Sequence, residues 1–332
     1  MKTNPYKYET VFITLIISFG LLLRGFNINF NDFWSDEMVS FYLSNPKLEF
    51  LDTIKLIFAS NLTLTFEIIL KFFHKIFGYN FEYSRYLTLL LSVFSIFYFY
   101  RLIKTNKSYY SAILGIVLLS INIYHIRYSV ELRSYTLTFL LTIILLNLIF
   151  YQGKIREFRN FLSYLLIFIV SLLMLFSHAY SIIVIISINF YIFLLWALKR
   201  NFTKSTALLF LSTSISSLLF ILIYISNISH TPTWLPALKS SFFTNYYFSS
   251  FFGSRILGLL HLVILLYLIT SQFSKVLKKF DIELFLIIFL FLTYIIPISY
   301  SLIFNPILID RYIFFVLIPI LYLISSLTLD FK

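Results

Sequence analysis

The sequence predicts an all-α, polytopic integral membrane protein with about ten transmembrane helices, and three observations support this fold class. Hydrophobic residues make up 60% of the 332-residue chain and charged residues only 12%, whereas an ordinary soluble domain has about 25% charged residues. The mean hydropathy is +0.91. Apolar stretches of about 20 residues recur along the whole sequence, and each is long enough to cross about 30 Å of hydrocarbon. A transmembrane β-barrel is not indicated, because no segments of about ten strictly alternating residues are found.

The apolar stretches set the expected spans in order. The first span is expected at 10–26, and a non-spanning stretch at 27–86 forms the first outer loop. Further spans are expected at 87–103, 109–126, 134–151, 160–178, 181–198, 205–227, 255–272, 283–303 and 312–329. No loop is long and polar enough for a separate soluble domain, so residues 1–332 are expected to form a single transmembrane domain.

Two segments of the first outer loop read as helices that lie in the membrane interface. Residues 38–43 form an amphipathic stretch that ends before Pro46. Residues 62–77 mix Leu, Phe and Ile with Glu67, Lys71 and His74. Such mixtures of apolar and charged residues suit helices lying in the plane of the interface.

Basic residues predict the orientation. They gather in alternate short loops and at the termini, at Lys2, Lys7, Arg101, Lys104, Lys107, Lys154, Arg156, Arg159, Lys199, Arg200, Lys204, Lys275, Lys278, Lys279 and Lys332. The protein is expected in the plasma (inner) membrane. The positive-inside rule then places these loops and both termini in the cytoplasm. The opposite, non-cytoplasmic face then holds the first outer loop, the turns at 127–133 and 304–311 and the loop at 228–254. Because the basic residues are dispersed over loops, nucleic acid is not an expected partner.

An acidic cluster follows the first expected span. Asp32, Trp34, Asp36 and Glu37 lie within six positions, although only 14 residues of the chain are acidic. Carboxylates near a bilayer are costly and often functional. Alternatively, Ser35 caps a helix, and Asp36 and Glu37 in its first turn complement the helix dipole. The two interpretations are compatible, since a helix N-terminus can hold a reactive carboxylate in place.

Two further outer turns offer charged residues on the same face. The turn at 128–135 contains Glu131 and Arg133, and Arg127 lies four residues before Glu131, which also fits an ordinary helical ion pair. At the last span, Arg311 is either a snorkelling arginine with Asp310 as counter-ion or a phosphate ligand, because its planar fork matches phosphate oxygens.

Metal and redox chemistry are not indicated. Cysteine is absent and none of the five histidines has a partner at ligand spacing on one helix, so no thiolate or histidine metal site is expected. The adjacent acidic pair leaves room for a divalent ion without predicting one. We therefore expect no cofactor and metal-independent chemistry.

Short motifs in this order resemble those of the multi-spanning GT-C glycosyltransferases of the protein O-mannosyltransferase superfamily, which includes bacterial lipid A aminoarabinose transferases. The motifs are Trp34-Ser35-Asp36-Glu37, Phe77-Gly78, Phe81-Glu82-Tyr83-Ser84-Arg85-Tyr86, Ser129-Val130-Glu131-Leu132-Arg133-Ser134-Tyr135, His178-Ala179-Tyr180, Trp234-Leu235-Pro236 and Arg311-Tyr312 with Pro319. Each is unspecific alone, but their joint order and placement on one membrane face are specific.

The resemblance implies a sugar donor on a polyprenyl phosphate, transfer on the outer face with inversion, and a glycan, lipid or protein acceptor. It implies the following roles for residues of this chain: Asp36 as base, Glu37 as its neighbour, Glu131 as second acid, Arg133, Arg85 and Arg311 facing the donor phosphate, and Trp34, Tyr135, His178 and Tyr312 as further substrate-site candidates. Two departures are noted. The family's His-Pro-Pro-Leu-like element is replaced by Asn61-Leu62-Thr63-Leu64, and an appended soluble domain of larger members is expected to be lacking.

The residues also suit this reaction independently of the resemblance. Sugar transfer from a lipid phosphate needs a base that accepts the acceptor proton and cations that stabilise the departing phosphate. Two other functions stay open. A transporter or lipid flippase would place ionisable groups near the bilayer midplane, often in repeated halves. A non-catalytic scaffold would use the acidic pair only as a helix cap.

Overall fold

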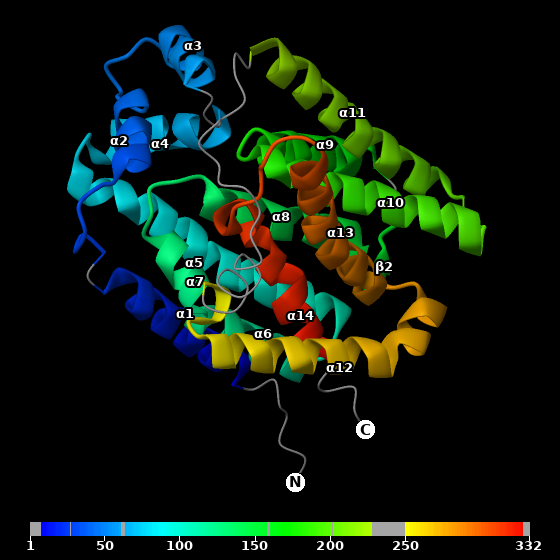
Figure 1. The fold of residues 1–332 in the computed structure, drawn as a ribbon. Coiled ribbons are helices and arrows are strands. Elements are labelled where there is room, and N and C mark those ends of the chain that lie inside the picture. The colour runs from blue at the N-terminus through cyan, green and yellow to red at the C-terminus, as the bar shows by residue number, and fades with distance from the viewer. Residues whose placement is uncertain are drawn as a thin grey trace.

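Helices make up most of the residues that the computed structural model describes, which are 8–26, 28–60, 64–157, 160–200, 202–227 and 250–327. Figure 1 shows the long helices running side by side, with the short helices of the first outer loop gathered at one end. The helices and strands are α1 (Glu9–Gly25), α2 (Ser35–Leu43), α3 (Phe50–Ala59), α4 (Leu64–Phe77), α5 (Phe81–Asn106), α6 (Tyr109–Ile121), α7 (Ile123–Ser129), α8 (Tyr135–Ile149), β1 (Phe150–Tyr151), β2 (Lys154–Ile155), α9 (Phe161–Leu175), η1 (Ala179–Ser181), α10 (Ile182–Lys199), α11 (Lys204–Asn227), α12 (Arg255–Lys279), α13 (Ile282–Ile303), η3 (Asp310–Val316) and α14 (Leu317–Leu327).

The all-α membrane fold predicted from the sequence is confirmed, and each of the ten predicted spans overlaps a helix. Among the described residues, six helical segments are long and apolar enough to cross a membrane, and the bent pair α6 and α7 makes a seventh. Helices α1, α8 and α9 are shorter, at 17, 15 and 15 residues. The chain is therefore a multi-pass membrane protein, while the count of ten spans stays a prediction.

The third predicted span is broken rather than continuous. Helices α6 and α7 meet at an angle of 60° around Asn122, whose side chain accepts a hydrogen bond from the backbone N–H of His125 and so caps α7. The Asn122 amide also donates to the carbonyl of Phe251 at 3.0 Å. Asparagine side chains compete for backbone groups in this way, and such competition ends helices.

A fully buried arginine fastens α1 to this break. Arg24 donates to the carbonyls of Ser120 at 2.9 Å and Leu119 at 3.1 Å in the last turn of α6. It also lies 2.8 Å from Nδ1 of His125. The guanidinium therefore supplies partners to backbone groups that the bend exposes, as a helix end buried away from water requires.

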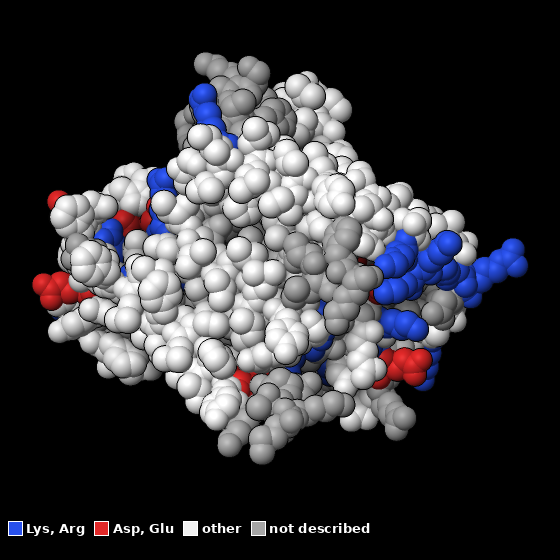
Figure 2. Space-filling view, turned by 90° about the horizontal axis from the view of Figure 1, so that it is seen from below, with Lys and Arg blue, Asp and Glu red and all other residues white. Residues whose placement is uncertain are grey.

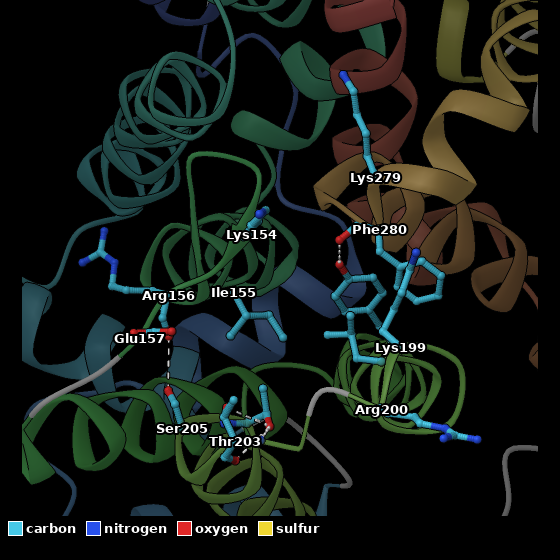
Figure 3. A pocket seen from close by; sticks show the side chains of 13 residues that line it. Lys154, Ile155, Arg156, Glu157, Lys199, Arg200, Thr203, Ser205, Lys279 and Phe280 are labelled. Atoms are coloured by element: carbon cyan, nitrogen blue, oxygen red, sulfur yellow. Dashed lines mark hydrogen bonds between the residues drawn. The ribbon is translucent and has the colours of Figure 1, made fainter.

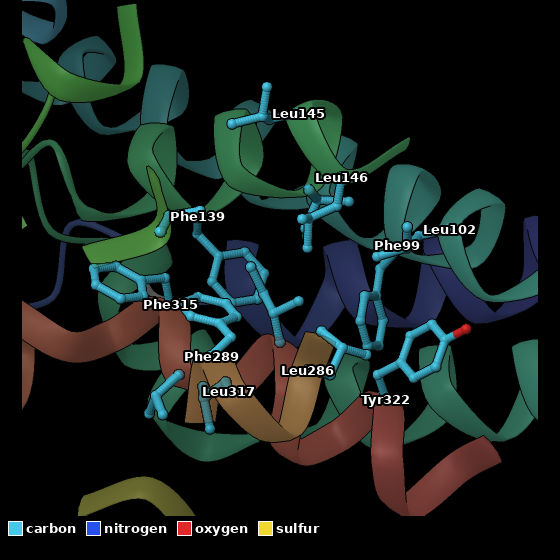
Figure 4. Packing of buried hydrophobic residues seen from close by; sticks show 14 of the residues in the cluster. Phe99, Leu102, Phe139, Leu145, Leu146, Leu286, Phe289, Phe315, Leu317 and Tyr322 are labelled. Atoms are coloured by element: carbon cyan, nitrogen blue, oxygen red, sulfur yellow. The ribbon is translucent and has the colours of Figure 1, made fainter. Parts of the chain in front are cut away.

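The hydrophobic core lies where α5, α8, α13 and the η3–α14 segment meet (Figure 4). Phe99, Phe139, Phe289 and Val316 are all fully buried there. Figure 4 shows the ring of Phe139 reaching from α8 toward the side of Phe289 and Leu317. This core fixes α8 and η3 relative to each other, and their neighbouring ends carry Tyr135 and Arg311.

The first outer loop forms three short helices, as its amphipathic pattern predicts for two of its segments. Helix α2 begins one residue before the predicted acidic pair, but its N-cap is Trp34, not Ser35. Glu37 at the third helical position accepts a hydrogen bond from the backbone N–H of Trp34 at 3.3 Å. Helix α4 coincides with the predicted segment at 62–77 and is buried on the side that carries Glu67, Lys71 and His74.

At the far end of α8 a hairpin replaces the last residues of the fourth predicted span. Strands β1 and β2 pair antiparallel, Phe150 with Ile155 and Tyr151 with Lys154. The two loop residues, Gln152 and Gly153, have φ of 50° and 80°, which suits a two-residue hairpin turn. Seen from below, Lys and Arg side chains gather at this end of the molecule, on the right of Figure 2, and uncharged side chains cover most of the middle.

Candidate functional site

A buried arginine organises the segment between α1 and α2. Arg85, at the start of α5, donates through Nη1 to the carbonyls of Ile28 and Asn31 and through Nη2 to that of Asp32 at 3.2 Å. Its Nε and Nη2 form a bidentate pair with Glu37 at 3.0 and 2.8 Å. These bonds use all five N–H donors of the guanidinium. We therefore remove Arg85 from the predicted phosphate-binding residues, since no donor is left for a phosphate.

Glu37 is likewise fully engaged. Its side chain is 1% exposed, and besides Arg85 it accepts from the backbone N–H of Leu132 at 2.7 Å and from that of Trp34. The carboxylate thus ties the turn at 131–133 to the first turn of α2. This geometry gives Glu37 the contacts of a positioning residue, and the catalytic role that the resemblance implies for it stays a prediction.

Asp36, unlike Glu37, contacts Arg311. Its Oδ2 lies 3.8 Å from Nη2 of Arg311, and its side chain is 37% exposed. The guanidinium of Arg311 lies over the Trp34 ring, 5.0 Å from the centroid. The counter-ion of Arg311 is therefore Asp36, not the sequence neighbour Asp310, which is buried.

Arg133 extends this cluster toward the first outer loop. Its Nη1 donates to the backbone carbonyl of Asp36 at 3.2 Å and to Oγ of Ser40 at 3.1 Å. Ser40 in turn donates to Oε1 of Glu67 at 2.9 Å. A chain of contacts thus runs from the backbone of Asp36 to a carboxylate on α4 that is 1% exposed.

The buried Glu67 predicts a pH-dependent stability. Burial raises its pKa to about 7 from the ordinary 4.5, although Arg133 and Ser40 act in the opposite direction. The folded state thus holds a proton that the unfolded chain releases, so this stabilisation is complete below about pH 4.5 and is lost as the pH rises through about 7. We expect the Tm of Glu67→Gln in detergent to fall less than that of the wild type between about pH 5 and 7. The exposed Glu82→Gln serves as control and should keep the wild-type slope; an unchanged slope in Glu67→Gln would contradict the assignment.

Glu131 is the second acid of the site. Burial raises its pKa to about 7, with Arg127 opposing and Glu37 adding to the rise. The predicted helical ion pair is present, with Nε of Arg127 3.6 Å from Oε1 of Glu131, but Arg127 is 64% exposed. Such an exposed partner compensates a partly buried carboxylate only weakly.

Aromatic side chains close the site on the side of α8, η1 and η3. The His178 ring lies 5.7 Å from that of Tyr135 and 5.2 Å from that of Tyr312. Burial, and then the charges of Arg133 and Arg311, lower the pKa of His178 to about 3. The ring is therefore neutral, and its Nδ1 accepts from the backbone N–H of Tyr180, which leaves the proton on Nε2.

A pocket of about 370 Å³ opens beside these residues. Trp34, Glu37, Glu131 and Arg311 line it. Asp36 is not a lining residue but contacts one of them, Arg311. Its further walls are Ile28, Asn31, Asp32, Arg85, Arg127, Tyr128 and Val130. The outer turns predicted from the sequence thus meet at one end of the helices around a cavity rich in charge.

Sequence reasoning overlooked three contributions to this site. Arg127 and Tyr128 line the pocket, although the sequence suggested only an ion pair for the first. Ser40 links Arg133 to Glu67, and only its place one turn after Asp36, on the same side of α2, could have indicated it. Within the described part of the chain, no three His, Asp or Glu side chains come together as a metal site would require. The motif residues at 61–63 and 234–236, with Arg159, His230 and both termini, lie outside the described residues.

No protein-family model matches the chain, and no curated protein matches its sequence significantly. Solved structures do resemble it. The oligosaccharyltransferase of Archaeoglobus fulgidus in its apo form superposes with a TM-score of 0.62 at 12% identity, over 99% of this chain and 51% of the other. The same enzyme tethered to an acceptor peptide gives 0.61 at 11%, over 99% and 50%. The archaeal oligosaccharyltransferase AglB in complex with an inhibitory peptide and a dolichol-phosphate gives 0.62 at 11%, over 98% and 50%.

These similarities establish the fold, which is the GT-C membrane fold, as the sequence resemblance led us to expect. The chain spans about half the length of the oligosaccharyltransferases it matches.

Proposed function

We propose that this protein is a membrane glycosyltransferase that moves a sugar from a polyprenyl-phosphate donor to an acceptor hydroxyl, with inversion at the anomeric carbon and Asp36 as the base. The fold supports a transferase that uses a lipid-linked donor, because the similar oligosaccharyltransferases have the same membrane architecture and one of them was solved with a dolichol-phosphate. The proposal extends to the protein O-mannosyltransferase and aminoarabinose transferase superfamily, on the motifs quoted above.

The observation that carries this proposal is the contact between Asp36 and Arg311. Of the two adjacent acids, Glu37 is buried and pairs with Arg85. The side chain of Asp36 is 37% exposed and lies beside the guanidinium of Arg311. A donor phosphate that binds Arg311 competes with Asp36 for that cation. The carboxylate is then released to accept the proton of an acceptor hydroxyl as the new glycosidic bond forms.

The cations have separate tasks in this mechanism. Arg311 is held over Trp34 and offers its fork to the phosphate, whose charge grows as the sugar leaves. Arg133 fixes the backbone at Asp36 and adds a second positive charge nearby. The neutral His178, with Tyr135 and Tyr312, supplies a polar aromatic wall for the sugar.

The donor tail lies in the bilayer with its phosphate at headgroup depth, where the outer turns meet. We place this face outside the cytoplasm of the plasma membrane, with both termini inside, because the positive-inside rule assigns the opposite loops to the cytoplasm. The acceptor is a glycan, lipid or protein hydroxyl on that face.

The direct test is transfer by the purified protein in proteoliposomes that contain a polyprenyl-phosphate sugar. Mass spectrometry of surface glycans, lipids and proteins from a gene disruption would show which hexose-type mass is lost. Uptake or flipping of the lipid by the proteoliposomes, with no transferred sugar, would instead favour a transporter or flippase.

Replacement of Arg311 should mainly weaken the use of donor. We expect Arg311→Gln to raise the donor KM on the order of tenfold or more, because a charge-assisted contact to phosphate contributes about 1.5–3 kcal/mol. Lys55→Gln is the matched control, since Lys55 is a 76% exposed cation of the same outer loop. Steady-state kinetics with varied donor checks the effect, and an unchanged KM and rate would remove Arg311 from the site.

Metal removal should leave the activity intact. We expect the transfer rate to stay within about twofold of its initial value after dialysis against EDTA, because the arginines supply the positive charge that the departing phosphate needs. Restoration of a lost rate by Mg²⁺ or Mn²⁺ would show that the acidic residues bind a metal after all.

A further inference from the structure

A second pocket, of about 580 Å³, lies at the opposite end of the molecule from the candidate site. Helices α8 and α10 begin near Tyr135 and His178 in the site, and they end at this pocket, where Lys154 follows α8 and Lys199 closes α10. The pocket therefore opens toward the other membrane face. Figure 3 shows it between the β1–β2 hairpin, the end of α10, the start of α11 and the end of α12.

The rim of this pocket is strongly basic. Its cations are Lys154, Arg156, Lys199, Arg200 and Lys279, and its one lining carboxylate is Glu157. All five cations are exposed. Figure 3 shows them on three separate parts of the chain, with the side chains of Arg156, Arg200 and Lys279 extending outward.

Lys199 and Arg156 contact neutral groups, and these contacts do not cancel their charge. Nζ of Lys199 donates to the carbonyl of Lys278 at 3.2 Å and lies 5.1 Å from the centre of the Phe280 ring. The guanidinium of Arg156 lies 5.2 Å from the centre of the Tyr151 ring. The rim thus presents a net positive field into the pocket.

The N-terminus of α11 adds to that field. Thr203 and Thr206 exchange backbone-to-hydroxyl hydrogen bonds of 3.2 Å, which cap the helix, and both line the pocket. The positive end of the helix dipole therefore points at the same space as the cations, and such an end favours an anion.

The floor, in contrast, is apolar and firmly built. Ile155, Tyr191, Leu195 and Phe280 form it, and the Tyr191 hydroxyl donates to the carbonyl of Phe280 at 2.8 Å. The hairpin is tied to the start of α13, because the N–H of Ile282 donates to the carbonyl of Gly153 at 2.7 Å. Just outside the pocket, Leu198 and Phe202 are 66% and 69% exposed.

We propose that this pocket binds the headgroup of an anionic phospholipid from the leaflet on that face of the membrane. The basic rim and the helix N-terminus recognise the phosphate, and the apolar floor with the exposed Leu198 and Phe202 contacts the glycerol and the upper acyl chains. A free phosphate ion would use the cations but would have no use for the apolar surface. Basic pockets between membrane helices are suited to such headgroups. The proposal is independent of the reaction catalysed at the other end.

The test is lipid binding by the delipidated, full-length protein in detergent, followed by native mass spectrometry. We expect dioleoylphosphatidylglycerol to bind at least about tenfold tighter than dioleoylphosphatidylcholine. The double variant Lys154→Gln, Arg200→Gln should lose most of this preference, because each basic residue near a headgroup adds about a factor of five. The control Arg101→Gln, Lys275→Gln removes the same charges from the same end of the molecule but outside the pocket, and it should keep the preference.

Three results would overturn the proposal: no preference in the wild type, an equal loss in both double variants, or displacement of phosphatidylglycerol by millimolar inorganic phosphate. The last result would identify a site for a free anion. Size-exclusion profiles and Tm without added lipid check folding. If the pocket variant does not fold, the charge-preserving Lys154→Arg, Arg200→Lys variant takes its place and must retain the wild-type preference.

Discussion

The Asp36→Asn variant is expected to fold as the wild type does and to lose sugar transfer by a factor of about 10² to 10⁴, the usual contribution of a positioned base. The amide keeps the size of the side chain but cannot accept the acceptor proton at neutral pH. Folding should survive because Asp36 is 37% exposed and its ion pair with Arg311 is long, at 3.8 Å. Transfer from a polyprenyl-phosphate sugar in proteoliposomes measures the loss.

The matched control is Asp52→Asn, which makes the same chemical change at an exposed residue of the same outer loop. It should transfer sugar at the wild-type rate. A turnover rate of Asp36→Asn close to that of the control would contradict the proposed mechanism. A folded but inactive Asp36→Asn would also exclude the scaffold function, in which the acidic pair only caps α2.

The Glu37→Gln variant, one residue further on, is expected to fail in a different way, through stability. Breaking a buried ion pair costs about 3–5 kcal/mol, because it leaves the partner charge uncompensated. Here the partner is Arg85, which is 5% exposed and has no water to replace the lost charge. We expect a clearly lower Tm in detergent, together with a loss of folded protein during purification.

Glu49→Gln, an exposed position in the same loop, should retain the wild-type Tm. If Glu37→Gln kept its Tm and lost only activity, Glu37 would be a catalytic residue rather than a positioning one. The two adjacent acids thus give opposite signatures, and comparing them separates chemistry from architecture within a single helical turn.

Much of this fold can be predicted from the sequence, because apolar stretches of membrane length have few alternatives to helix. The spans near 283–303 and 205–227 match α13 and α11 almost to the residue. The break in the third span was missed, since a lone Asn122 in an apolar run does not reveal that its side chain caps a new helix. The end of α8 was placed two residues late for a similar reason, as Phe150 and Tyr151 suit a strand equally well.

The candidate site was predicted less completely. The order of spans and basic loops predicted that the acidic cluster and the 128–135 turn share one face, and the structure places Leu132 and Arg133 against Glu37 and Asp36. Spacing could not predict that Glu37 pairs with Arg85, 48 residues away, or that Arg311 turns from Asp310 to Asp36. Such pairings depend on how helices pack, and no local pattern contains that information. The chemical roles of these residues remain predictions.

The bond between Arg24 and the α6–α7 break has a consequence for biosynthesis. Arg24 leaves the ribosome 95 residues before Leu119, its acceptor on α6. Until then its guanidinium can reach only the carbonyl of Gly20 in its own helix, and a charge in that state belongs among lipid headgroups. Helix α1 therefore takes its final depth in the bilayer only after the apolar segment at 109–126 has been synthesised and inserted, although α1 itself is made well before that segment.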